Sequence, residues 1–222
     1  RQELLNEQLT RMGELCEVAI GKATTALKEG SMEQAQKVIE ADEEIDQAET
    51  DIERLCLKLL LQQQPVARDL RQISAALKMI TDMERIGDHS ENLCELAQTL
   101  KKSKQKFSPW AVEQATEMRN RVEAMLEEAL QMFASRETQP QMAADINRRE
   151  EIIDDATQEL KDLHIERLNQ GKCSVVAGTV FMDMLTNLER IADHCTNIAY
   201  SMTNQKNHEL QSTIPVEPVA VR

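Results

Sequence analysis

The amino-acid sequence predicts an all-α fold, with two tandem three-helix bundles that together form an elongated six-helix protein. Apolar residues recur at helical spacing along nearly the whole chain of 222 residues. The six glycines and five prolines provide little material for the many tight turns of an all-β fold. A constellation of charged residues also occurs twice. Because aromatic residues make up only 2% of the chain, the core must consist of Leu, Ile, Val, Ala and Met.

The duplication is the strongest of these signals. Residues 82–92 read DMERIGDHSEN and residues 187–197 read NLERIADHCTN, so six residues keep their relative positions at an offset of 105. An acidic pair precedes each copy. This pair is Asp42 and Asp46 in the first half, and Glu150 and Asp154 in the second. Such self-similarity predicts two copies of one structural unit.

In the first half, we expect helices near residues 2–29, 32–63 and 66–102. Gly30 is placed to end the first helix. Ser31 is placed to cap the second, because a serine oxygen accepts hydrogen bonds from the free amides of a first turn. Pro65 predicts the next break, since the residue before a proline is disfavoured in the α region. The short connections imply antiparallel neighbours.

In the second half, we expect helices near residues 109–134, 141–169 and 174–205. A basic, polar connector at residues 101–108 precedes them, and Ser108 followed by Pro109 suits an N-cap and a first helical position. Further breaks are predicted between Ser135 and Pro140 and at Gly171. The predicted units are residues 1–104 for the first repeat, 105–207 for the second repeat and 208–222 for a flexible tail.

Composition narrows the function. The formal charge of −13 argues against nucleic acid as a partner, because binding to phosphate backbones requires clustered Lys and Arg. An acidic surface suits cations or a basic partner protein. Five scattered cysteines without a CxxC motif favour reduced thiols and a cytoplasmic location. The sequence has no bilayer-spanning apolar run and no signal-like start, so we expect no membrane insertion.

Carboxylate pairs in each half form the candidate site. On the third predicted helix, Met83 and Ile86 belong to an apolar stripe, whereas Glu84 and Asp88 fall on the opposite side, where we expect them to be exposed. The sixth helix repeats the pattern. Hard cations bind clustered carboxylate oxygens, which predicts metal binding. The predicted ligands are Asp42, Asp46, Glu84 and Asp88 in one half and Glu150, Asp154, Glu189 and Asp193 in the other.

Two other interpretations of these residues stay open. Arg85 and Arg190 flank the acidic pairs and can neutralise them without a metal. The helices can also form a structural scaffold that binds no ion. His89 and His194 lie about 100° around their helices from the carboxylates. Their position fits a hydrogen bond between packed helices better than a role as metal ligands.

These motifs resemble those of the PhoU family, the negative regulators of bacterial phosphate uptake. The resemblance covers nearly the whole chain. It rests on ERIGD at residues 84–88, ERIAD at residues 189–193, the acidic pair before each, and PVARDLR at residues 65–71. It implies two three-helix repeats whose acidic motifs bind multinuclear clusters of iron, zinc or a similar metal, with the same eight carboxylates as ligands.

The resemblance also implies two partners, the ATPase of the phosphate ABC transporter and the sensor histidine kinase of the phosphate regulon. A metal-binding helical adaptor between them would restrain both phosphate uptake and starvation signalling. The second half, with Gly171, Lys172 and Cys173 before its motif, is also similar to the cytosolic PhoU-like domains of sodium–phosphate cotransporters, which stays an alternative. The exposed helical faces are compatible with a homodimer.

An enzymatic function has the least support. Ferritin-like di-iron sites use Glu-x-x-His motifs with ligands that project inward, and none of the four histidines follows a glutamate at that spacing. The sequence also lacks a Gly-rich phosphate loop and a recognisable nucleophile–base pair. We therefore expect a regulator without catalytic residues, rather than a carboxylate-bridged metalloenzyme.

Overall fold

The computed structural model describes the whole chain except residues 1, 63, 136–139, 202 and 204–222. Its helices are α1 (Gln2–Glu29), α2 (Met32–Gln62), α3 (Ala67–Lys102), α4 (Pro109–Ala134), α5 (Pro140–Asn169) and α6 (Val175–Ser201). The described residues contain no strand, and the predicted all-α fold of six helices is confirmed. The predicted tail at residues 208–222 lies outside the described residues.

Local signals explain where the helices begin and end. Ser31 Oγ accepts a hydrogen bond from the Gln34 amide (3.3 Å), and Ser108 Oγ accepts one from the Ala111 amide (3.2 Å), so both predicted caps are confirmed. Gly30 ends α1 with a positive φ of 65°. The predicted end of α6 near residue 205 is wrong. The amide and hydroxyl of Thr203 both bond to the Tyr200 carbonyl in a tight turn after Ser201.

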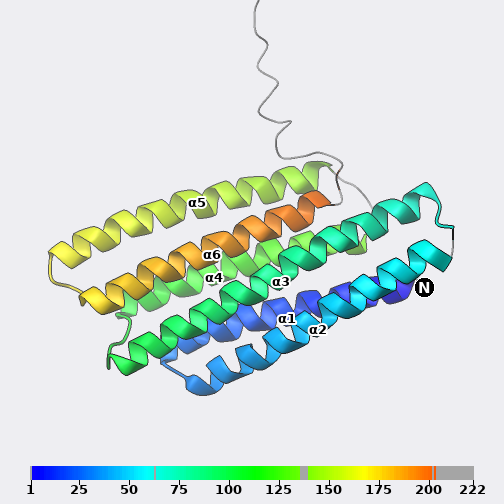
Figure 1. Cartoon of the computed structure of the whole chain (residues 1–222). Coiled ribbons are helices and arrows are strands. Elements are labelled where there is room, and N and C mark those ends of the chain that lie inside the picture. The colour runs from blue at the N-terminus through cyan, green and yellow to red at the C-terminus, as the bar shows by residue number, and fades with distance from the viewer. Residues whose placement is uncertain (1, 63, 136–139, 202, 204–222) are drawn as a thin grey trace, which may run out of the picture.

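The six helices lie side by side as long rods, with α2 and α5 on opposite outer sides (Figure 1). Between them, α1, α3, α4 and α6 form the centre of the molecule. Within the first half α2 packs against α1 and α3, and within the second half α5 packs against α4 and α6. The two halves meet where α3 packs against α6 and α1 packs against α4. Each half is therefore a three-helix unit, and the two units share a broad interface.

A single apolar core runs through both halves. The stripe predicted on α3 is buried. Its predicted counterpart on α6 runs from Met184 to Met202 and is buried as far as Ile198, while Met202 lies outside the described residues. Methionines such as Met12, Met83 and Met184 are fully buried, because a flexible thioether can fill the space that the scarce aromatic residues leave. None of the described helices combines the length and the apolarity that crossing a membrane requires.

Candidate metal centres

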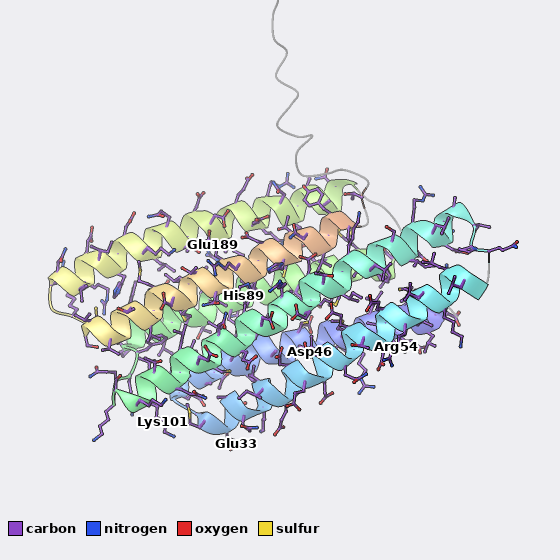
Figure 2. The ribbon with its side chains drawn as sticks, viewed as in Figure 1. Glu33, Asp46, Arg54, His89, Lys101 and Glu189 are labelled. Atoms are coloured by element: carbon purple, nitrogen blue, oxygen red, sulfur yellow. The ribbon has the colours of Figure 1, made fainter. Side chains whose placement is uncertain are left out.

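The predicted carboxylates form two clusters, one at the junction of α2 with α3 and one at the junction of α5 with α6. In the first cluster, Asp42 and Asp46 lie close enough to Asp88 for their charges to interact, and Glu84 interacts with Asp88 and Glu49. In the second cluster, Glu150 interacts with Asp193, and Asp154 interacts with both Glu189 and Asp193. Figure 2 labels Asp46 on α2 and Glu189 on α6, in separate halves of the molecule. We call these groups the first and second acidic clusters.

The clusters are less exposed than the sequence predicts. Of the eight carboxylates, only Asp46 and Asp193 are exposed, and the other six are half-buried. The expected outward display is met only in part, because α2 packs against α3 and α5 packs against α6 beside these carboxylates. In particular, Asp42 Oδ1 and Asp154 Oδ1 are buried, and no described residue donates a hydrogen bond to either oxygen. A buried acceptor without a donor is unfavourable, so each oxygen would gain from a positive partner.

A glycine allows α2 to approach α3 at the first cluster. A Cβ at Gly87 would lie 2.6 Å from Asp42 Oδ1 and 3.3 Å from Ile45 Cδ1. Gly87 lies inside a regular helix, where any residue can adopt the backbone conformation. Glycine is required here because Asp42 approaches so closely. The corresponding positions in the second repeat hold Ala192 and the longer Glu150.

Burial and crowding make protonation of the first cluster easier. The pKa of Asp42 is raised from 3.8 to about 7, mainly by burial, with smaller contributions from a hydrogen bond with Glu91 and from the charges of Asp46, Glu91 and Asp88. The pKa of Glu84 is raised from 4.5 to about 7, mainly by burial and also by Asp88 and Glu49, while the charge of Arg85 opposes the shift. Two carboxyl groups can share a hydrogen bond only when one is protonated. Asp42 and Glu84 therefore bind protons near neutral pH more readily than isolated carboxyl groups do.

The second cluster behaves in the same way. The pKa of Glu150 is raised from 4.5 to about 7, mainly by burial and also by a hydrogen bond with Asp193, while a hydrogen bond with Thr196 opposes the shift. The pKa of Asp154 is raised from 3.8 to about 6, mainly by burial and next by the charges of Glu189 and Asp193. Both halves thus concentrate negative charge in a partly desolvated space.

Comparison of the two clusters reveals a residue that sequence reasoning missed. Glu91 faces Asp42 across the junction, and its counterpart in the second repeat is Thr196, which bonds to Glu150. Glu91 lies three residues after Asp88, on the same side of α3, and this spacing could have identified it. Because the second copy has threonine at this position, a search for identical residues in both copies passes over it.

Arg85 partly neutralises the first cluster. Its guanidinium lies 3.8 Å from Glu84 Oε2 and 3.6 Å from Asp88 Oδ2. These distances are long for charge-assisted hydrogen bonds, and the Arg85 side chain is largely exposed. In the second repeat, Arg190 has no carboxylate oxygen within 4.0 Å among the described residues. Neutralisation by arginine is therefore weak in the first cluster and missing from the described part of the second.

The donor atoms of both clusters fit a hard cation. They are carboxylate oxygens, which such ions prefer, and Asp42 Oδ1 and Asp154 Oδ1 have no hydrogen-bond partner among the described residues. In the described part of the chain, however, no three His, Cys, Asp or Glu side chains converge on a point that could hold an ion. Metal binding would therefore require carboxylate side chains to change rotamer on a fixed helical frame.

The two histidines lie between the repeats and not in the acidic clusters. His89 Nδ1 is 3.1 Å from Asn187 Oδ1, and His194 Nδ1 is 2.9 Å from Asp82 Oδ1. The imidazole rings stack with their centroids 5.5 Å apart, and His89 faces the junction of α3 and α6 in Figure 2. The expected hydrogen bonds between packed helices are thus present. Because equivalent residues exchange these bonds, α3 and α6 are related by an approximate two-fold axis.

Comparisons of the sequence and of the structure with known proteins all match the same family. The family model of the PhoU domain matches residues 9–97 and 115–202. A phosphate-specific transport system accessory protein PhoU homolog from Clostridium acetobutylicum is 30% identical over 90% of this chain and 89% of its own length. The crystal structure of PhoU from Pseudomonas aeruginosa has a TM-score of 0.80 and 29% identity, covering 90% of this chain and 94% of that chain. The phosphate transport system regulatory protein PhoU from Streptococcus pneumoniae has a TM-score of 0.78 and 28% identity, covering 90% and 92%.

Proposed function

The chain belongs to the PhoU family, and on that premise we propose that it is a non-enzymatic regulator of phosphate uptake and of phosphate-starvation signalling. The names of its relatives support this role, because they are called accessory or regulatory proteins of phosphate transport. The observation that carries the proposal is the family match to both halves of the chain. In this proposal the chain works in the cytoplasm and has no catalytic residue.

The arrangement of the helices supports an adaptor mechanism. The two acidic clusters involve α2 and α5, which lie on opposite outer sides of the molecule (Figure 1). Two partners can therefore be contacted at the same time without competing for one surface. We assign these partners as the ATPase of the phosphate ABC transporter and the sensor histidine kinase of the phosphate regulon. Binding to both would restrain transport and kinase output together when phosphate is plentiful.

Metal ions are part of the proposed mechanism. Asp42, Asp46, Glu84 and Asp88 would hold cations such as iron or zinc in the first cluster, and Glu150, Asp154, Glu189 and Asp193 would do so in the second. A bound cation would offset the desolvation and charge repulsion that raise the pKa values of Asp42 in the first cluster and Glu150 in the second. This chain's own residues would orient the ion, and the shared helical frame would hold the two sites at a fixed separation.

Deletion of the gene in its host tests the regulatory role. We expect phosphate-starvation genes to be expressed in high phosphate, because the restraint on the kinase is lost. Complementation with the intact chain should restore repression. Unchanged expression after deletion, measured with a starvation-promoter reporter, would contradict the proposal. Crosslinking in cells, followed by detection of the transporter ATPase and the kinase, tests the two partners separately.

Metal analysis of protein purified without a chelator tests the acidic clusters. The double variant Glu84→Gln and Asp88→Asn should lose the metal of the first cluster and keep that of the second, so bound metal falls by about half. The double variant Glu43→Gln and Glu44→Gln is the matched control, because it removes the same charge from exposed positions on α2. Equal metal content in all three proteins would contradict metal binding at the first cluster.

A further inference from the structure

A second site lies at the end of the molecule where the α3–α4 connector meets the turn between α5 and α6, far along the helices from the acidic clusters. A pocket of about 210 Å³ opens there. Its lining includes Lys106, Arg167 and Lys172, together with the hydroxyls of Ser108 and Ser174. None of the described residues that line it is acidic. The chain has a formal charge of −13, whereas the three cationic side chains make the surroundings of this pocket positively charged. We call this site the basic pocket.

The cations of the basic pocket lack acidic partners. Among the described residues, no carboxylate oxygen lies within 4.0 Å of Lys106, Arg167 or Lys172. Arg167 instead lies over the ring of Trp110, 4.5 Å from its centroid, and donates a hydrogen bond to Ser108 Oγ at 3.4 Å. The aromatic ring holds the guanidinium in place without neutralising it, so its charge remains available to an anion.

Local backbone structure brings these groups together. At the end of α5, the Lys172 amide bonds to the Arg167 carbonyl and the Gly171 amide bonds to the Leu168 carbonyl, with Gly171 at a φ of 68°. This arrangement is a Schellman motif, and it places Lys172 beside the pocket as soon as the helix ends. Ser108 Oγ already accepts bonds from Arg167 and from the Ala111 amide, so its own proton is free to be donated.

Three of the five aromatic residues of the chain line the same pocket. The sequence has only three Phe and one Trp, and Phe107, Trp110 and Phe181 all line the pocket. The Phe181 ring contacts those of Phe107, Trp110 and His164 at centroid distances of 5.4 to 5.9 Å. His164 is 95% buried, and its ring lies against Gly178, where a Cβ would come within 2.5 Å of it. The pocket therefore has rigid walls.

The first repeat shows that the fold itself does not need these residues. At the offsets that relate the two copies, His164 and Arg167 correspond to Cys56 and Leu59. Gly178 and Phe181 likewise correspond to Ile73 and Ala76. All four residues of the first repeat are buried and apolar. The same position in the architecture is thus filled by an ordinary core in one copy and by an aromatic and cationic pocket in the other. Packing alone does not account for the difference.

We propose that the basic pocket binds a phosphate group. Arginine, lysine and serine hydroxyls are the donors that recognise tetrahedral oxyanions, and the N-termini of α4 and α6 add positive potential. The pocket is smaller than the roughly 300–1,000 Å³ of sites for drug-sized ligands, which favours a small oxyanion. One face of Trp110 is covered by Arg167, and Phe181 packs against the same ring, so a nucleotide base finds little free aromatic surface. The occupant we favour is therefore free inorganic phosphate.

Trp110 provides a direct measurement, because it is the single tryptophan of the chain and lines the pocket. The intact protein is titrated with inorganic phosphate at millimolar concentrations, and separately with AMP, at constant ionic strength set with sodium chloride. Tryptophan fluorescence follows phosphate binding, and isothermal titration calorimetry follows both ligands, since AMP absorbs light. We expect saturable binding of phosphate that sodium chloride alone does not reproduce.

Three variants give the test its controls. Arg167→Gln and Lys172→Gln should each weaken binding by about tenfold or more, because each removes a charge-assisted hydrogen bond. Lys58→Gln removes a charge from an exposed position on α2 and should leave binding unchanged. Lys172 is exposed, so its variant keeps the test informative if Arg167→Gln disturbs Trp110. Binding of either ligand that both pocket variants weaken supports the site, and the tighter ligand identifies the source of the phosphate group. No binding of either ligand, or equal weakening by Lys58→Gln, overturns the proposal.

Discussion

Replacing Asp42 with asparagine should stabilise the protein at about pH 8 and have little effect at about pH 4. Asparagine has nearly the same shape as aspartate but carries no charge. In the folded protein, burial and the neighbouring carboxyls raise the pKa of Asp42 from 3.8 to about 7. Above this pH the folded protein must hold a charge that its surroundings disfavour, whereas the unfolded chain holds the same charge in water.

The sign of the effect follows from proton linkage. Between about pH 4 and pH 7, Asp42 keeps its proton in the folded state and loses it in the unfolded state. Its contribution to stability is therefore greatest at low pH and declines as the pH rises through this range. A shift of about 3 pKa units corresponds to about 4 kcal/mol at most. Asp42 is only half-buried, and solvent screening reduces the expected gain at pH 8 to about 1–2 kcal/mol.

Urea unfolding followed by far-UV circular dichroism, in the presence of a chelator, measures this difference at both pH values. In a thermal unfolding experiment at pH 8, the same gain would raise the Tm of Asp42→Asn by about 3–6 °C for a chain of this size. Glu43→Gln is the control, because Glu43 is an exposed neighbour on α2 and should give no pH-dependent change. Destabilisation by Asp42→Asn at pH 8, or an equal gain from Glu43→Gln, would refute the reasoning.

Three further predictions use the same structure. The unmodified protein, measured by calorimetry with a chelator, should lose stability from about pH 5 to about pH 7.5. The raised pKa values of Glu84, Glu150 and Asp154 act in the same direction as that of Asp42, so a stability that rises with pH would contradict them. Gly87→Ala should lower the metal content of the first cluster, because the new methyl group would displace Asp42 Oδ1. A Cβ at Gly21 would lie 3.1 Å from Glu123 Oε1, which is outside the first cluster, so Gly21→Ala should leave the metal content unchanged. Asp82→Ala should cost about 1–2 kcal/mol in urea unfolding, because Asp82 Oδ1 accepts from both His194 and Asn197. Asp51→Ala, at an exposed position, serves as the comparison. An equal loss of unfolding free energy in both variants would show that the contact between the repeats contributes no stability.

The sequence allowed the individual helices to be predicted closely. Ser31, Ser108 and Gly30 act within one turn of the chain, so their effects can be read locally. The apolar stripe that includes Met83 and Ile86 was predicted for the same reason, because helical periodicity depends only on spacing. The carboxylate quartets could be grouped because the duplication indicated which segments correspond.

The remaining features depend on which helix covers which face, and periodicity does not contain that information. Asp42 lies on α2 and Asp154 lies on α5. One oxygen of each is buried because α2 packs against α3 and α5 packs against α6. The contacts of His89 and His194 require that α3 and α6 pack against each other, although they belong to different repeats. The basic pocket joins Trp110 to Arg167, which are distant in sequence. Only the packed arrangement brings such residues together.

The packing of the two halves against each other affects how the molecule unfolds. Helices α3 and α6 each bury side chains against both repeats, so detaching either half would uncover a large apolar area on the other. We therefore expect heat or urea to melt the whole molecule in one cooperative step. An isolated half would have to recover the missing surface by pairing with a second copy of itself.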